Sequence, residues 1–83
     1  MARELNETKL AEMNALVDAE VRRVASKNDP FSSPHEGWGI LYEEVDELWD
    51  EVKKKKKVRN PQLMREEAMQ IAAAAIRFMH DLT

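Results

Sequence analysis

Apolar residues recur at the spacing of an amphipathic helix in three successive stretches of the chain, at about residues 4–26, 34–57 and 61–82. The first stripe is narrow, with polar residues on its flanks, and the second is the most regular. The three stripes are Leu10, Met13, Val17, Val21 and Val24; then Trp38, Leu41, Tyr42, Val45, Leu48, Trp49 and Val52; then Met64, Ala68, Ile71, Ala75, Phe78 and Leu82. The pattern predicts an all-α chain of three helices.

Two of these helices have clear start signals. Ser33 is a natural N-cap, Pro34 suits the first helical position, and Glu36 can close a capping box. Asn60 and Pro61 repeat the cap and proline at the third helix. The link at about residues 58–60 is short, so we expect the second and third helices to form an antiparallel hairpin.

The third helix also carries apolar residues away from its main stripe. Met69 and Ile76 lie on the opposite face, and the tetrad 72–75 is all alanine, which lets neighbouring backbones approach closely. Alanine is also simply the best helix former. If the alanines serve close approach of neighbouring helices, they favour burial of this helix at the centre of a dimeric or tetrameric helical bundle.

Length and composition support an assembly of small domains. The 83 residues form a single domain, 1–83, and a chain of this size has a marginal core. It has no cysteine for disulfides or thiolate metal sites, and its two histidines argue against an imidazole zinc site. Oligomerisation is the remaining way to add stability, so we expect a homo-oligomer.

Charge and hydropathy limit the kinds of partner that the protein is expected to bind. Sixteen acidic and 13 basic residues give a net charge of −3, which argues against general nucleic-acid binding. The chain has neither an apolar stretch of the roughly 20 residues that a membrane helix needs nor a signal-peptide core. We therefore expect a soluble, cytoplasmic protein with no membrane partner.

One acidic residue, Glu67, lies on the apolar side of its helix and not on the side expected to face solvent. Glu67 lies about 40° from Ile71 on the helical projection, so it points with the apolar stripe. A buried carboxylate is nearly always paired with a cation or bound to a metal. One interpretation is an ion pair with Arg22, Arg23 or Arg77.

The second helix offers partners for the other interpretation, a metal site. Glu44 and Glu47 are three residues apart, which places them side by side on a helix, and Glu43 adds a third carboxylate beside them. In an antiparallel hairpin, Glu67 can face this pair. Carboxylates that converge in this way repel one another unless a cation lies between them. An all-oxygen cluster selects hard ions, so the sequence predicts Mg²⁺ or Mn²⁺.

Two short motifs carry a family resemblance. Residues 43–47 read E-E-V-D-E, and after a 19-residue spacer residues 67–70 read E-A-M-Q. Over about residues 36–82 the chain resembles the MazG-like all-α nucleotide pyrophosphohydrolases, whose motif is E-E-x-x-E, a spacer, then E-x-x-D. The resemblance implies a Mg²⁺-dependent enzyme for nucleotide-pool house-cleaning. Such an enzyme hydrolyses a nucleoside triphosphate between its α and β phosphates, giving a monophosphate and pyrophosphate.

The resemblance also implies roles for individual residues. Glu44, Glu47 and Glu67 would be metal ligands, with Gln70 as a fourth, and Glu43 would hold or deprotonate the attacking water. Gln70 stands where the family has aspartate, so it offers a carbonyl oxygen but no negative charge. This departure keeps a second interpretation open, a non-catalytic helical module that binds nucleotide or a partner.

A triphosphate needs cations, and its base needs a stacking surface. Lys55, from the run 53–57, and Arg77 are the candidates for phosphate contacts. Lysines near a helix C-terminus can equally remain solvated. Trp38 is the candidate for base stacking, with Trp49 and Phe31 as other available rings. Both tryptophans lie in the middle of the apolar stripe, so the alternative role for them is core packing.

Overall fold

The computed structural model describes residues 2–83 and contains three long helices. They are α1 (Glu7–Ala25), α2 (Pro34–Val52) and α3 (Pro61–Leu82), and a short 3-10 helix, η1 (Lys56–Val58), lies between α2 and α3. The prediction of an all-α chain is confirmed, since residues 2–83 contain no strand. None of the helices in this range is both long and apolar enough to span a membrane.

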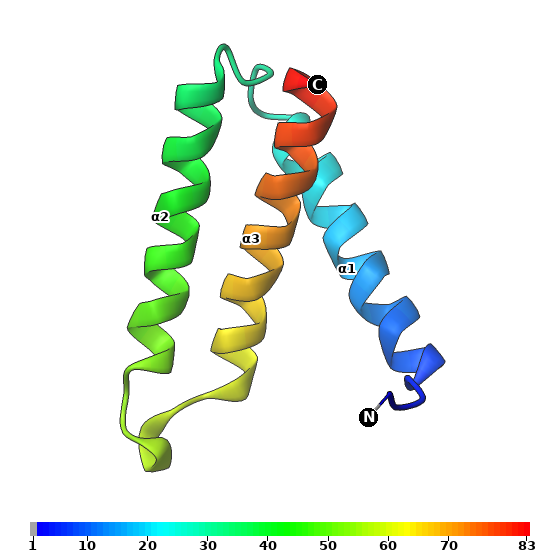
Figure 1. The fold of residues 1–83 in the computed structure, drawn as a ribbon, viewed down its shortest axis with the longest axis vertical. Helices are drawn as coiled ribbons and strands as arrows, with labels where there is room; N and C mark the ends of the chain where they lie inside the picture. The colour runs from blue at the N-terminus through cyan, green and yellow to red at the C-terminus, as the bar shows by residue number, and fades with distance from the viewer. Residues whose placement is uncertain (1) are drawn as a thin grey trace.

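The third helix is the centre of the fold. It lies between α2 and α1 and packs against both, whereas the backbones of α1 and α2 do not approach each other closely within residues 2–83 (Figure 1). The start of α2 lies beside the end of α3, because Gly37 adjoins Phe78 and Leu82. Further along, the middle of α2 lies beside the first half of α3.

The predicted helix starts are confirmed. The Ser33 hydroxyl accepts a hydrogen bond from the Glu36 backbone N–H at 3.1 Å, and Pro34 takes the first helical position. The Glu36 carboxylate accepts a hydrogen bond from the Ser32 hydroxyl at 2.6 Å. In the predicted capping box it would bond to Ser33, so the contact lies one residue earlier than predicted. Asn60 caps α3 by accepting from the Gln62 N–H at 2.9 Å.

The end of α2 differs from the prediction. The helix ends at Val52, and the link to α3 runs over residues 53–60. Five consecutive lysines would place like charges three and four residues apart on a continued helix, which is unfavourable. Two of them pair back onto the last turn, Lys53 with Asp50 at 3.0 Å and Lys54 with Glu51 at 2.8 Å.

The face that α2 turns toward α3 holds only Leu41 and Leu48 of the predicted stripe. Core packing of the two tryptophans is wrong for the single chain, because Trp38 is 62% exposed and Trp49 55% exposed. Gly37 accounts for the orientation, since it lets α2 approach α3 so closely that a Cβ there would lie 2.6 Å from Phe78 Cδ2. The less exposed row of α2 is Gly37, Leu41, Glu44, Leu48 and Glu51, one position away from the row of large apolar residues.

The apolar residues on the second face of α3 are accounted for within one chain. Ala73 and Ala74 are buried, and Met69 lines a groove between α1 and α3 together with Met13 and Leu16. The alanine tetrad and Met69 therefore do not by themselves require a second subunit. The core is nevertheless thin. Phe31, Ala73 and Ala74 are the only buried apolar residues of the range 2–83.

Candidate metal centre

Three glutamates from two helices meet between α2 and α3. Glu44 and Glu47 of α2 and Glu67 of α3 each present a carboxylate oxygen, and these oxygens lie within 4.8 Å of one another. Glu44 and Glu67 are half-buried, and Glu47 is exposed. These are the carboxylates that the sequence singled out, and the structure brings them together.

The local fold explains how the three side chains meet. Glu44 belongs to the row of α2 that faces α3, and Glu47 follows one turn later on the same side. The close approach at Gly37 sets the orientation of α2, and that orientation turns Glu44 toward Glu67. A helix rotated to bury its tryptophans would instead turn Glu44 away from α3.

Burial and mutual repulsion raise the pKa of two of these carboxyls. The pKa of Glu44 is raised above its ordinary value of 4.5, first by burial and then by the charges of Glu47 and Glu67. The pKa of Glu67 is raised by burial, by a hydrogen bond with Glu47 and by the charge of Glu47. Both shifts mean that the folded protein resists placing negative charges together here.

The ion-pair interpretation of Glu67 is not what the structure contains. Arg22 pairs with Asp18 and Arg23 with Glu20, both within α1. The Arg77 guanidinium lies over the Phe31 ring, 4.4 Å from its centroid. Within residues 2–83, none of the three arginines forms an ion pair with Glu67.

The donor set fits a hard divalent cation. Three carboxylate oxygens close enough to share one ion, without nitrogen or sulfur ligands, are the chemistry that Mg²⁺ and Mn²⁺ prefer. A cation at this position would also offset the repulsion that, after burial, raises the two pKa values. Glu44, Glu47 and Glu67 are the residues that would hold it.

A fourth acid near the cluster was not singled out from the sequence. Glu51 lies four residues after Glu47, on the row of α2 that faces α3, and its charge contributes to the raised pKa of Glu67. Its carboxylate pairs with Lys54 at 2.8 Å. The 3-4 spacing of Glu44, Glu47 and Glu51 was the signal available for it.

Gln70 has a partner outside the carboxylate cluster. Its side-chain N–H donates to Glu20 Oε2 at 2.6 Å, which links α3 to α1. Glu20 is only 7% exposed and also accepts two hydrogen bonds from Arg23, at 2.7 and 2.6 Å. The role of Gln70 as a metal ligand stays a prediction, since the structure engages its amide elsewhere.

Glu20 is the buried acid that sequence reasoning missed. Its pKa is lowered from 4.5 to about 2, chiefly by the hydrogen bonds from Arg23, with a further contribution from Gln70 and with burial acting in the opposite direction. The sequence placed Glu20 on the flank of the first apolar stripe. A flanking acid three residues before an arginine was the only available sign of this network.

The remaining candidates lie around or beyond the cluster. Glu43 is exposed, and its charge adds to the raised pKa of Glu44. Lys55 is exposed in the link that follows α2. Trp38 lies near the start of α2 beside Phe78. Arg77 is ten residues from Glu67, about 15 Å along α3, so it is not brought to the carboxylates.

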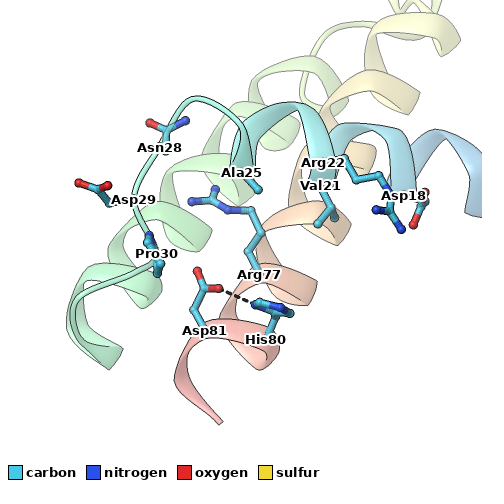
Figure 2. Close-up of a pocket in the computed structure, with 10 residues that line it drawn as sticks. All are labelled: Asp18, Val21, Arg22, Ala25, Asn28, Asp29, Pro30, Arg77, His80 and Asp81. Carbon is cyan, nitrogen blue, oxygen red and sulfur yellow. Dashed lines mark hydrogen bonds and ion pairs between the residues drawn. The ribbon is translucent and has the colours of Figure 1, made fainter.

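A hollow of about 310 Å³ lies where α1, the loop after it and the end of α3 meet (Figure 2). Arg22 pairs with Asp18 at 3.0 Å, and the Arg77 guanidinium lies over the Phe31 ring. Asp81 accepts from the Phe31 backbone N–H at 3.1 Å and lies 2.8 Å from His80 Nδ1. Figure 2 shows Arg77 and Asp81 extending from α3 below the loop that carries Pro30. These contacts attach the loop to α3.

Comparisons with protein-family models, with curated proteins and with solved structures found no match. The MazG-like resemblance therefore rests on the motifs in the sequence.

Proposed function

We propose that this protein is a Mg²⁺-dependent nucleoside triphosphate pyrophosphohydrolase of the MazG-like kind, which converts a nucleoside triphosphate to the monophosphate and pyrophosphate. The observation that supports the proposal is the convergence of Glu44, Glu47 and Glu67 within 4.8 Å, at the positions of the family's motif. We further propose a cytoplasmic homo-oligomer, a dimer or tetramer, in which α2 and α3 form an antiparallel hairpin.

Each candidate residue has a role in this proposal. The three clustered glutamates hold the ion, which when bound would neutralise phosphate charge and acidify a water molecule. Glu43, exposed beside Glu44, positions the attacking water and accepts its proton. Lys55 lies in the link after α2, eight residues beyond Glu47, and is the lysine that contacts the phosphates in this proposal.

Of the other three candidate residues, two would have to change their present contacts to take part. Trp38 is exposed, so its ring is accessible to a base. Arg77 lies at the far end of α3 and would have to leave Phe31 to reach a phosphate. Gln70 would have to exchange its bond with Glu20 for the ion.

The second candidate is a non-catalytic module that binds nucleotide or a protein partner. The observation that favours it is the bond between Gln70 and Glu20, which engages the residue at the position of the family's final aspartate. On this interpretation the three carboxylates bind an ion and a nucleotide without hydrolysis.

Pyrophosphate release tests the proposal. The protein is incubated with a panel of ordinary and modified nucleoside triphosphates in Mg²⁺ or Mn²⁺, and we expect release that chelation of the metal abolishes. Glu67→Gln should lose this activity, whereas Glu12→Gln, on the exposed surface of α1, should retain it. No release from any triphosphate, with binding retained by calorimetry, would favour the non-catalytic module.

A further inference from the structure

The outward face of α2 carries a continuous row of large apolar side chains. Exposed fractions along the row run from 36% at Val52 to 62% at Trp38. Its members are Trp38, Tyr42, Val45, Trp49 and Val52, and we refer to them as the outer row. Their separations alternate between four and three residues, which is the repeat of a coiled-coil seam.

The exposed area of the outer row is large enough for a specific interface. Its three aromatic rings are more than half exposed, and Trp38 and Tyr42 form one surface with ring centroids 6.2 Å apart. At the usual areas of these residue types, the outer row exposes about 500 Å² in one copy. Two copies would bury about 1,000 Å² before any rim is counted, which is the lower bound of a specific interface.

The chain itself has little else to stabilise it. Within residues 2–83 no large side chain is fully buried, and the strongest apolar periodicity of the sequence faces outward. An apolar patch of this size is often an interaction site. Covering it would supply the apolar burial that the core within one chain lacks.

We propose that the outer row is covered by the outer row of a second copy, with the two α2 helices antiparallel. The lysine run selects this direction. In a parallel pair the segments 53–57 of both copies would lie side by side and repel, whereas an antiparallel pair separates them to opposite ends. In the antiparallel pair the positive N-terminal end of each α2 dipole also lies beside the negative C-terminal end of the other, which is favourable.

The charges of α2 argue against an anionic membrane as the occupant. Beside the outer row the exposed surface of α2 carries only acidic charge, at Glu43, Asp46, Glu47 and Asp50. An interfacial helix that binds anionic lipid carries Lys and Arg on its polar face. The 3-4 repeat of the outer row, which a second copy can match, therefore fits the same helix better than a lipid surface.

The repeat fixes the register of the pair. In an antiparallel seam the first position of one repeat packs against the fourth position of the other. Keeping both rows in step sets Trp38 against the partner's Trp49, and Tyr42 against the partner's Val45. Glu44 and Glu67 remain on the α3 side of α2, so this interface leaves the carboxylate cluster uncovered. It does cover Trp38, so base stacking on that ring and this interface exclude each other. The interface itself does not rest on the proposed enzymatic activity.

The first test measures the mass of the wild-type protein in solution by sedimentation equilibrium. We expect a dimer or an even multiple of it, and Val45→Glu should halve the mass. Leu5→Glu is the matched control, because it places the same charge on an exposed apolar residue just before α1, which packs on α3 rather than on α2, and it should leave the mass unchanged. A wild-type monomer at the highest soluble concentration would overturn the proposal.

A second test determines the register and does not require a folded monomer. The chain has no cysteine, so Trp38→Cys and Trp49→Cys each introduce a single thiol. We expect a disulfide between the two variants when they are mixed and oxidised, and none from either variant alone, because Cα atoms must lie within about 7 Å. Cross-linking of Trp38→Cys with itself would indicate a parallel pair. A dimer without the mixed disulfide would place the interface elsewhere. Either result would overturn the proposal.

Discussion

Gln70 of α3 donates a hydrogen bond to the buried carboxylate of Glu20 in α1, at 2.6 Å. An amide suits this position because it can donate to a carboxylate, whereas an aspartate could only repel it at neutral pH. An amide at residue 70, where the MazG-like motif has aspartate, thus has a structural reason in this chain. It is one of the contacts that attach α1 to α3.

Replacing Gln70 with aspartate should destabilise the fold. Gln70→Asp places a second negative charge beside Glu20 and removes a donor, and we expect a loss of about 1–3 kcal/mol in the free energy of unfolding. Urea denaturation measures this. Gln62→Asp, an exposed glutamine of the same helix, should change stability by less than about 0.5 kcal/mol.

A double variant separates charge repulsion from lost packing. Gln70→Asp combined with Glu20→Gln restores a donor facing a carboxylate but loses the charge that Arg23 pairs with, so the double variant should lose less stability than the sum of the two single losses. If the double variant is as unstable as the sum of the two single variants, the bond between residues 20 and 70 is not the cause.

Glu67→Gln should alter the response to divalent ions more than it alters the fold. The substitution removes one of several converging negative charges, so the metal-free protein should be equally stable or more stable by up to about 1 kcal/mol. Mg²⁺ or Mn²⁺ should raise the melting temperature of the wild type, because binding to the native state stabilises it, and should not raise that of the variant. Differential scanning fluorimetry with and without chelator measures both effects, with Glu12→Gln as the control. A large loss of stability in metal-free Glu67→Gln would instead show that Glu67 is part of a structural ion pair.

The stability of the metal-free protein should pass through a maximum at mildly acidic pH. The pKa values of Glu44 and Glu67 are raised in the folded state above the ordinary value of 4.5. Above pH 4.5 the folded state therefore still holds protons that the unfolded state has already lost. Stability should therefore increase as the pH falls from neutral toward 4.5. The pKa of Glu20 is lowered to about 2, so its contribution is complete above 4.5 and is lost as the pH falls from there toward 2.

A urea titration at each pH measures the free energy of unfolding. Two variants show which carboxyl causes the change on each side of pH 4.5. Glu67→Gln should flatten the rise between neutral pH and 4.5, and Glu20→Gln should flatten the loss below 4.5. A wild-type profile that increases steadily from pH 4.5 to neutral would contradict the repulsion described for the carboxylate cluster.

The two glycines of α2 should respond in opposite ways to alanine. At Gly37 a Cβ would lie 2.6 Å from Phe78 Cδ2 and 3.1 Å from Leu82 Cδ1, so Gly37→Ala should cost about 1–3 kcal/mol by separating α2 from α3. At Gly39 no atom lies within 4 Å, so Gly39→Ala should gain up to about 1 kcal/mol from helix propensity. Thermal denaturation of the pair checks both. Equal effects at the two positions would mean that α2 does not pack closely at Gly37.

Local signals in the sequence predicted the helices well. The caps at Ser33 and Asn60, each followed by proline, gave the starts of α2 and α3, because capping depends on neighbouring residues. The inward direction of Glu67 followed from its place on the α3 stripe. Its meeting with Glu44 and Glu47 required only that α2 and α3 be neighbours.

The features that were not predicted depend on contacts between helices. The most apolar stripe of α2 was expected to face the core, but Gly37 permits a closer approach on the adjacent row and leaves Trp38 and Trp49 exposed. The partner of Gln70 lies 50 residues away in α1, beyond the reach of any local pattern. The periodicity of a stripe does not indicate whether its partner belongs to the same chain.

The central position of α3 has a consequence for how the molecule opens. Because α1 packs on α3 and its backbone does not approach α2 closely within residues 2–83, α1 can detach while the Glu44–Glu67 side of the molecule stays assembled. The backbone amides of α1 would then exchange with solvent deuterium through a partial opening, ahead of those at the α2–α3 junction.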